Sequence, residues 1–110
     1  MSYQHRELAS GRWAQLPFLE QMANIGSEVE RALNWQAKNN IAYSQKAFER
    51  ALELLDLTLD NATVPARFRE LARAREAIAD YFAGSNQFNS TEASWRRYFL
   101  PFAYFVRSHY

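Results

Sequence analysis

Apolar residues recur at helical spacing along almost the whole chain, and this pattern limits the possible folds more than any other feature. They stand three or four positions apart, as side chains on one face of an α-helix do. The periodic segments are 17–38, 41–60, 65–83 and about 91–109, and turns at 39–40, 61–63 and 84–90 separate them. Since no segment alternates as a strand does, the sequence predicts an all-α chain of four amphipathic helices.

The lengths of the helices and turns predict how the helices pack. A chain of 110 residues fits a single domain, residues 1–110, with one core. Turns of a few residues place successive helices antiparallel, so the simplest arrangement is a four-helix up-down bundle. Residues 1–15 are mixed and polar, and we expect a short N-terminal arm that Trp13 and Leu16 hold against the core.

Capping residues predict where the later helices begin and end. Thr63 can cap the third helix ahead of Pro65, because proline suits the first turn of a helix. Gly84 is expected to end this helix in a left-handed conformation. Asn89 or Ser90 is expected to cap the fourth helix.

The fourth predicted helix departs from a plain amphipathic pattern. Pro101 lies inside it, removes one backbone donor and should kink or break it. Seven aromatic residues fall between Trp95 and Tyr110, more than one helical face can hold. Leu100 and Tyr104 point away from the apolar stripe, close to arginines, which is typical of a protein–protein interface.

Two other segments offer interface candidates. The second helix, 41–60, is apolar over so wide an arc that one neighbour cannot cover it. It is either the central helix or a dimer face, with Leu54 and Leu57 as contact residues. Trp35 lies off the stripe of its own helix, so it either closes the end of the bundle or anchors a subunit contact.

Arg75 interrupts the apolar stripe of the third helix, between Leu71 and Ile78. A buried guanidinium without a partner is very costly, so we expect a carboxylate to meet it. Glu28 and Glu30 flank the stripe of the first helix and are the candidates. The pair would either fix the packing of the helices or form an anion site in a cleft of the bundle.

Arginine outnumbers lysine by 11 to 2, which favours specific paired or stacked contacts. An Arg-rich helix can follow phosphates, and aromatic residues beside arginine can stack on unpaired bases. The net charge is only +1, however, and acidic residues alternate with the arginines of the third helix, as on a solvent-exposed face. Candidate residues for binding nucleic acid or a phosphate ligand are Arg67, Arg73, Arg96, Arg97 and Arg107.

The sequence holds no arrangement typical of an enzyme or a metal site. It has no cysteine, which removes disulfides, thiolate catalysis and Cys-based zinc sites. The two histidines, His5 and His109, stand at opposite ends, and neither follows a glutamate by three positions as in a di-metal bundle. We therefore expect no enzymatic activity, no metal and no cofactor.

The same composition bears on location. No run of about 18 apolar residues is present that could span a membrane. Residues 1–14 lack the apolar stretch of a secretion signal. A chain without cysteine suits a reducing compartment, and we expect a cytoplasmic protein that does not associate with membranes.

Two segments carry a resemblance to known proteins. Pro17–Arg31 (PFLEQMANIGSEVER) and Ala47–Leu57 (AFERALELLDL) resemble a group of small uncharacterised prokaryotic all-helical proteins. The likeness extends over most of the chain as far as Trp95. It implies a helical fold and carries over no activity.

In size and helix number the chain is also similar to HEPN domains, helical bundles that often dimerise and sometimes cleave RNA. Active members place a histidine about four to six residues after an arginine on a late helix. Here His109 follows Arg107 by two positions. The motif is absent, so the resemblance concerns shape alone.

The sequence therefore leads to two hypotheses of function. The first is a non-enzymatic helical protein–protein interaction module that forms a homodimer or binds another protein. The alternative is binding of nucleic acid or a phosphate ligand through arginines and aromatic residues of the third and fourth helices.

Overall fold

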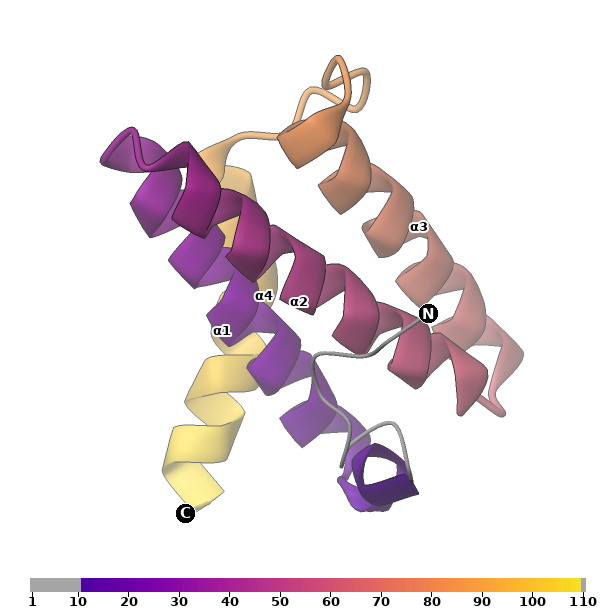
Figure 1. Cartoon of the computed structure of the whole chain (residues 1–110). Coiled ribbons are helices and arrows are strands. Elements are labelled where there is room, and N and C mark those ends of the chain that lie inside the picture. The colour runs from indigo at the N-terminus through magenta and orange to yellow at the C-terminus, as the bar shows by residue number, and fades with distance from the viewer. Residues whose placement is uncertain (1–10, 110) are drawn as a thin grey trace.

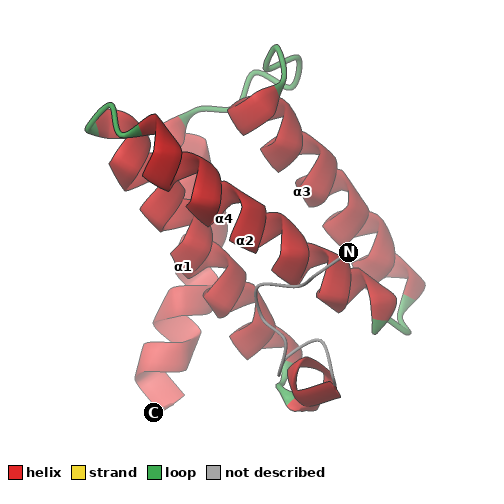
Figure 2. Cartoon of the chain, viewed as in Figure 1, coloured by secondary structure: helices red, strands yellow, loops and turns green. Residues whose placement is uncertain are grey.

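The structure is a computed structural model that describes residues 11–109, and within this range it has four α-helices and no strand (Figure 2). The helices are α1 (Phe18–Ala37), α2 (Ile41–Asp60), α3 (Pro65–Ala83) and α4 (Glu92–His109), preceded by the short 3-10 helix η2 (Trp13–Gln15). The prediction of an all-α chain is confirmed, and the predicted helix bounds are correct to within one residue. Residues 1–10 of the expected N-terminal arm lie outside the described range.

The four helices run alternately up and down, and α1 and α2 form the central antiparallel pair (Figure 1). α4 packs mainly against α1, whereas α3 packs mainly against α2. The predicted four-helix up-down bundle is confirmed. Because the two outer helices pack on different central helices, the contact between α1 and α4 is separate from the contact between α2 and α3.

The core is built mainly by α1 and α2, which face each other with their apolar stripes. Its buried apolar residues are Trp13, Met22, Ile25, Val29, Ala32, Leu33, Ala47, Phe48, Ala51, Leu54, Leu55, Leu57, Leu71, Ile78, Trp95 and Phe99. The wide apolar arc of α2 is covered by α1, α3 and η2 together. α2 was predicted to be either the central helix or a dimer face, and the structure shows that it is a central helix.

Leu54 and Leu57 are not interface residues, and that prediction was wrong. Their exposed fractions are 3% and 6%, because the neighbouring helices of the same chain already cover this side of α2. Burying a leucine stabilises a fold by about 1.5–3 kcal/mol. Both side chains therefore contribute to the stability of the single chain and are not available to a partner.

The segment before α1 is fixed to the core by Trp13, which is almost completely buried. Its indole Nε1 donates a hydrogen bond of 2.8 Å to Oγ1 of Thr58 on α2. The amide of Gln21 donates a bond of 2.8 Å to the backbone carbonyl of Trp13. Leu16 is partly buried against the same core. The expectation that Trp13 and Leu16 hold this part of the chain against the bundle is confirmed.

The ends of α3 differ from the prediction. Val64, and not Thr63, is the N-cap residue, and no side chain caps this end. The cause is Pro65, since a residue that precedes proline is pushed into an extended conformation. At the other end Gly84 is extended, with φ −106°, and the left-handed conformation belongs to Asn86, with φ 56°.

α4 also begins differently from the prediction. Thr91 and Ser94 exchange hydrogen bonds, each side-chain oxygen accepting from the backbone N–H of the other residue. Asn86 instead holds Ser90 within the preceding loop. The predicted caps Asn89 and Ser90 are therefore replaced by a reciprocal cap one step later. α4 then continues through the exposed Pro101 as one helix, which excludes a break there.

α1 and α4 approach each other most closely at Gly26. A Cβ atom at this position would lie 2.9 Å from both Cβ and Cδ1 of Phe99. Phe99 is itself buried, so its ring cannot move aside without disturbing the core. The absence of a side chain at Gly26 is what allows the Phe99 ring to pack directly on the backbone of α1.

We expect Gly26→Ala to destabilise the fold. Alanine favours a helix over glycine by about 1 kcal/mol, but overpacking a tight contact costs about 1–3 kcal/mol. Urea unfolding should show a net loss of up to about 2 kcal/mol. Ser27→Ala, at the exposed neighbouring position, is the control and should lose nothing. Equal or higher stability of Gly26→Ala would contradict the steric argument.

The outer helices α3 and α4 are joined by Tyr98, whose hydroxyl donates to Oε1 of Glu70 at 3.1 Å. Burial raises the pKa of Tyr98 above its ordinary value of 10.0, and the negative charge of Glu70 raises the pKa further. The neutral, protonated phenol is therefore the form that the folded state favours.

This raised pKa predicts how stability changes at alkaline pH. The folded state holds the Tyr98 proton more tightly than the unfolded chain, so its contribution is complete below about pH 10 and declines as the pH rises further. The free energy of unfolding should fall more steeply between about pH 10 and about pH 11.5 for the native chain than for Tyr98→Phe. Parallel curves for the two proteins would show that Tyr98 titrates normally.

Candidate interaction groove between α1 and α4

A groove of about 670 Å³ runs between α1 and α4. Its lining residues are Ala23, Gly26, Ser27, Val29, Glu30, Leu33, Ala93, Trp95, Arg96, Arg97, Phe99, Leu100, Ala103 and Arg107. Five of them are alanine, glycine or serine, and these small side chains leave the space that larger ones would fill. The volume lies in the range of sites that accept a ligand or several side chains of a partner.

Trp95 lines the groove and has a buried indole N–H. The residue is buried, with 6% of its surface exposed. Its Nε1 is the buried side-chain nitrogen or oxygen of the described residues that has no hydrogen-bond partner. An unpaired buried donor costs about 1–3 kcal/mol, so the site is less stable than a fully paired one.

Leu100 and Tyr104 stand on the outer side of α4, with 56% and 67% of their surfaces exposed. Leu100 lines the groove, and Tyr104 follows it one helical turn later. The structure thus leaves both side chains uncovered by the chain itself. Their role in an interface stays a prediction.

Arg97 and Arg107 lie on the same side of α4 and also line the groove. Both are exposed. Neither makes an ion pair with a carboxylate within residues 11–109. The groove therefore has an apolar centre and two arginines whose charges the described part of the chain leaves unbalanced.

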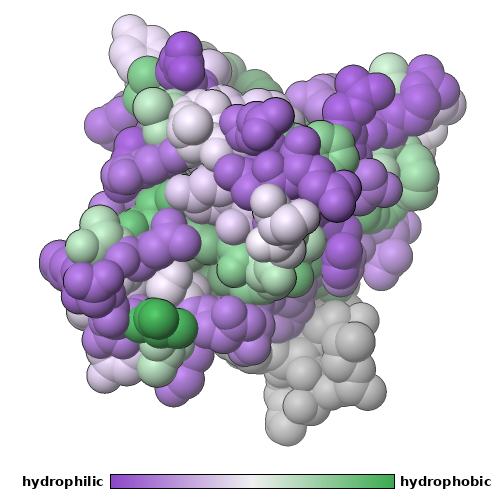
Figure 3. Space-filling view, turned by 90° about the horizontal axis from the view of Figure 1, so that it is seen from above, coloured by the Kyte–Doolittle hydropathy of each residue, from purple (hydrophilic) through white to green (hydrophobic). Residues whose placement is uncertain are grey.

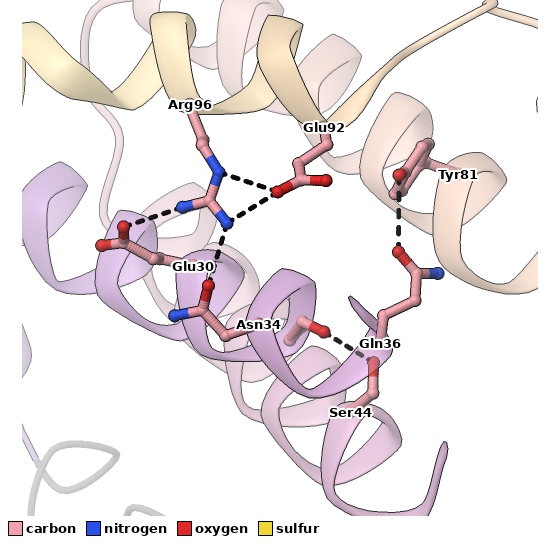
Figure 4. A network of polar contacts seen from close by, with 8 residues as sticks. Glu30, Asn34, Gln36, Ser44, Tyr81, Glu92 and Arg96 are labelled. Carbon is pink, nitrogen blue, oxygen red and sulfur yellow. Dashed lines mark hydrogen bonds and ion pairs between the residues drawn. The ribbon is translucent and has the colours of Figure 1, made fainter. Parts of the chain in front are cut away.

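Arg96, by contrast, is fully engaged in a network that ties α4 to α1 (Figure 4). Its Nη1 donates to Oε1 of Glu30 at 2.8 Å, and its Nη2 donates to Oδ1 of Asn34 at 2.9 Å. Nε and Nη2 both donate to Oε1 of Glu92 on α4 itself. With these partners in place, Arg96 holds α1 and α4, the two helices that line the groove, in a fixed position relative to each other.

Arg75 does not meet Glu28 or Glu30, and that prediction was wrong. Its Nε lies 2.6 Å from Oδ1 of Asp56 on α2, and its side chain is 36% exposed. The buried line of α3 is narrower than the sequence suggests, since it consists of Leu71, Ala74 and Ile78. Arg75 therefore lies at the edge of the contact with α2, where Asp56 is within reach. No buried anion site forms around it.

Among residues 11–109, the buried charged side chain is that of Glu28, at 7% exposure. Its Oε1 accepts from Nη1 of Arg31 at 2.8 Å, and its Oε2 accepts from Nε of Arg50 at 3.1 Å. Arg50 belongs to α2, so this pair links the two central helices. The two arginines satisfy the carboxylate from both sides, which is the condition for burying it.

Trp35 packs within the chain at the turn that joins α1 to α2. Its ring meets Tyr43 edge-on, with ring centroids 4.8 Å apart, and Lys38 Nζ lies 5.2 Å from its centroid. This supports the first alternative, that Trp35 closes the end of the bundle.

Seen from above, apolar and polar patches alternate on the surface (Figure 3), without one continuous apolar area.

The five arginines predicted to bind nucleic acid do not share one set of contacts. Arg67 stacks on Phe18, with its guanidinium 4.5 Å from the ring centroid. Arg73 is exposed on α3, and Arg96 is held by two carboxylates. Arg97 and Arg107 alone line the groove without an ionic partner. The five arginines therefore do not form one continuous line of unpaired charges on the surface.

The described residues show neither a metal site nor a membrane span. Within residues 11–109 no three His, Cys, Asp or Glu residues come close enough to hold a metal ion. No helix in this range is both long and apolar enough to cross a membrane. His5 lies outside the described residues.

Comparison of the chain with protein-family models, with curated proteins and with solved structures finds no match. The resemblances to a small prokaryotic helical family and to HEPN domains therefore stay predictions.

The sequence contained one signal of the groove, and it is Gly26. Glycine inside a helix costs about 0.5–1 kcal/mol relative to alanine, so an isolated one often marks a close approach of another backbone or ring. The Glu28–Arg50 pair had no such signal. It depends on which faces of α1 and α2 meet.

We expect the two carboxylates of α1 to differ sharply in their effect on stability. Glu28→Gln should lower the free energy of unfolding by about 1–3 kcal/mol, because it weakens two charge-assisted bonds in a buried place. Glu30→Gln should cost less than about 1 kcal/mol, because Arg96 keeps Glu92 and Asn34. Urea unfolding of both variants measures the difference. Equal losses would mean that burial does not strengthen the Glu28 pair.

Proposed function

We propose that this chain is a non-enzymatic protein–protein interaction module and that the groove between α1 and α4 is its binding surface. The observation that carries this proposal is an apolar groove of about 670 Å³ whose edge holds a leucine that is 56% exposed. Exposed large apolar side chains beside arginine are typical of the centre of protein interfaces.

A helical partner suits the shape of this surface. The groove lies between two helices, and small residues line it on both walls: Ala23 and Gly26 on α1, and Ala93 and Ala103 on α4. The side chains of a helix from the partner could enter the space that these residues leave. A second copy of the chain is the partner that the sequence favours, and a different protein is the other possibility. Since the chain has no cysteine, we place its activity in the cytoplasm.

Binding of nucleic acid or a phosphate ligand is the second candidate. The observation that favours it is that Arg97 and Arg107 lack a carboxylate partner among the described residues. It is supported less well than protein binding, because Arg67 and Arg96 already have partners within the chain. A phosphate-binding surface would also gain little from an exposed Leu100 between the two arginines.

A photo-crosslinking amino acid placed at Leu100 tests the interaction function. We expect a defined covalent adduct when the full chain is present with its native cell extract, because Leu100 would lie inside the interface. An adduct of twice the 12.9 kDa chain mass would identify a second copy, and any other protein mass a different partner. The same amino acid at Glu49, an exposed position on α2, is the control. Absence of an adduct, or identical adducts from both positions, would contradict the proposal.

A further inference from the structure

The outer side of α4 carries a regular line of exposed residues, which we call the α4 outer stripe. It consists of Ala93, Arg97, Leu100, Tyr104 and Arg107. Their spacing alternates between four and three positions, which is the spacing of residues that face a second helix in a coiled coil. Every member is exposed, so the chain itself does not cover this stripe.

Charge is distributed along the α4 outer stripe in a simple way. The apolar pair Leu100 and Tyr104 forms its centre, and Arg97 and Arg107 stand on either side. At a rise of about 1.5 Å per residue, the two arginines are about 15 Å apart along the helix. Since neither has a carboxylate partner within residues 11–109, the stripe presents a positive charge at each end of an apolar contact.

A second copy of the chain fits this pattern poorly. In the antiparallel two-fold pairing that sets Leu100 of each copy against Tyr104 of the other, Arg97 meets Arg107. In the parallel two-fold pairing, each arginine meets the same arginine of the other copy. Both symmetric arrangements bring like charges together, which opposes association.

The acidic side of a second copy is no better match. Glu49 and Asp60 on α2 could face the arginines, but the leucines beside them, Leu52 and Leu59, already pack against the core of their own chain and leave little apolar surface to cover Leu100 and Tyr104. Such a contact would also join two different surfaces, and it would continue into an open chain of molecules unless it closed into a ring.

We propose that the groove and the α4 outer stripe bind an acidic amphipathic helix from a different protein. The surface is the one proposed above as the binding surface, and the inference rests on that function. The partner helix would place apolar side chains in the groove over Leu100 and against the neighbouring exposed ring of Tyr104. Two of its carboxylates, about ten or eleven residues apart, would reach Arg97 and Arg107. Arginine pairs with carboxylates through two parallel hydrogen bonds, which fixes the direction and the position of the helix.

The other charges around the groove agree with this assignment. Arg96 is already held by Glu30 and Glu92, so it needs nothing from the partner. Glu92 lies in the first turn of α4, where the helix dipole favours a negative charge. The groups that an incoming helix has to satisfy are therefore Arg97 and Arg107.

Two fluorescent peptides test the proposal against the full chain. Both are amphipathic helices of about three heptads with leucines at the core positions. The acidic peptide has glutamates about ten residues apart at the flanks of the leucines, and the basic peptide has lysines there. Fluorescence anisotropy should show binding of the acidic peptide at least about ten-fold tighter than that of the basic one.

Variants of the chain assign the effect to the groove. The double variant Arg97→Glu/Arg107→Glu should reverse the preference and bind the basic peptide more tightly. Leu100→Asp should abolish binding of both peptides. Arg73→Glu is the matched control, since Arg73 is an exposed arginine on α3, outside the groove, and it should change nothing. Circular dichroism checks that each variant is folded, as expected for exposed positions.

Each other outcome overturns the proposal in a distinguishable way. Equal binding of the two peptides, lost in Leu100→Asp, would reject an acidic partner and keep the groove as a helix-binding surface. Binding of neither peptide would reject the acidic helix, and the crosslink at Leu100 would then decide the proposed function separately. A dimer in light scattering that Leu100→Asp dissociates would assign the groove to a second copy. Binding of single-stranded RNA that Arg97→Glu/Arg107→Glu abolishes, without binding of the acidic peptide, would assign the arginines to phosphates.

Discussion

The direct packing of Phe99 on the backbone of α1 at Gly26 is the contact on which the groove of this bundle depends. Because Gly26 has no side chain, Phe99 of α4 approaches to 2.9 Å from the position that a Cβ atom would occupy. The contact fixes the two helices against each other, and the small residues on either side of it then leave a groove. Gly26 and the small residues around it thus explain why α1 and α4 enclose a groove, whereas the contact between α1 and α2 is filled by large side chains.

The sequence was sufficient for the helices, their order and most of the core. Met22, Ile25, Val29 and Leu33 follow a period that only a helix satisfies, and they are all buried. The sequence was insufficient where the burial of a residue depends on how wide the contact between two helices is. Leu54 and Leu57 carry the same pattern whether a partner or the chain itself covers them, and here the chain covers them.

The candidate site could be predicted only in part for the same reason. Leu100, Tyr104, Arg97 and Arg107 were identified from α4 alone, because their direction relative to its apolar face is a property of one helix. Arg75 was misassigned, because a helical wheel gives the direction of a side chain but not which neighbour lies there. The groove required the distance between α1 and α4, which the pattern of neither helix contains.

The attachment of α3 has a further consequence for how the bundle moves. Its buried residues are only Leu71, Ala74 and Ile78, whereas α1 has seven buried residues and α2 has eight. It rests mainly on α2 and is held to α4 through the Tyr98–Glu70 bond. Local opening follows the amount of buried apolar contact. α3 also packs on α2 less extensively than α4 packs on α1, so its separation would cost less than that of α4 and would leave both walls of the groove, α1 and α4, in contact.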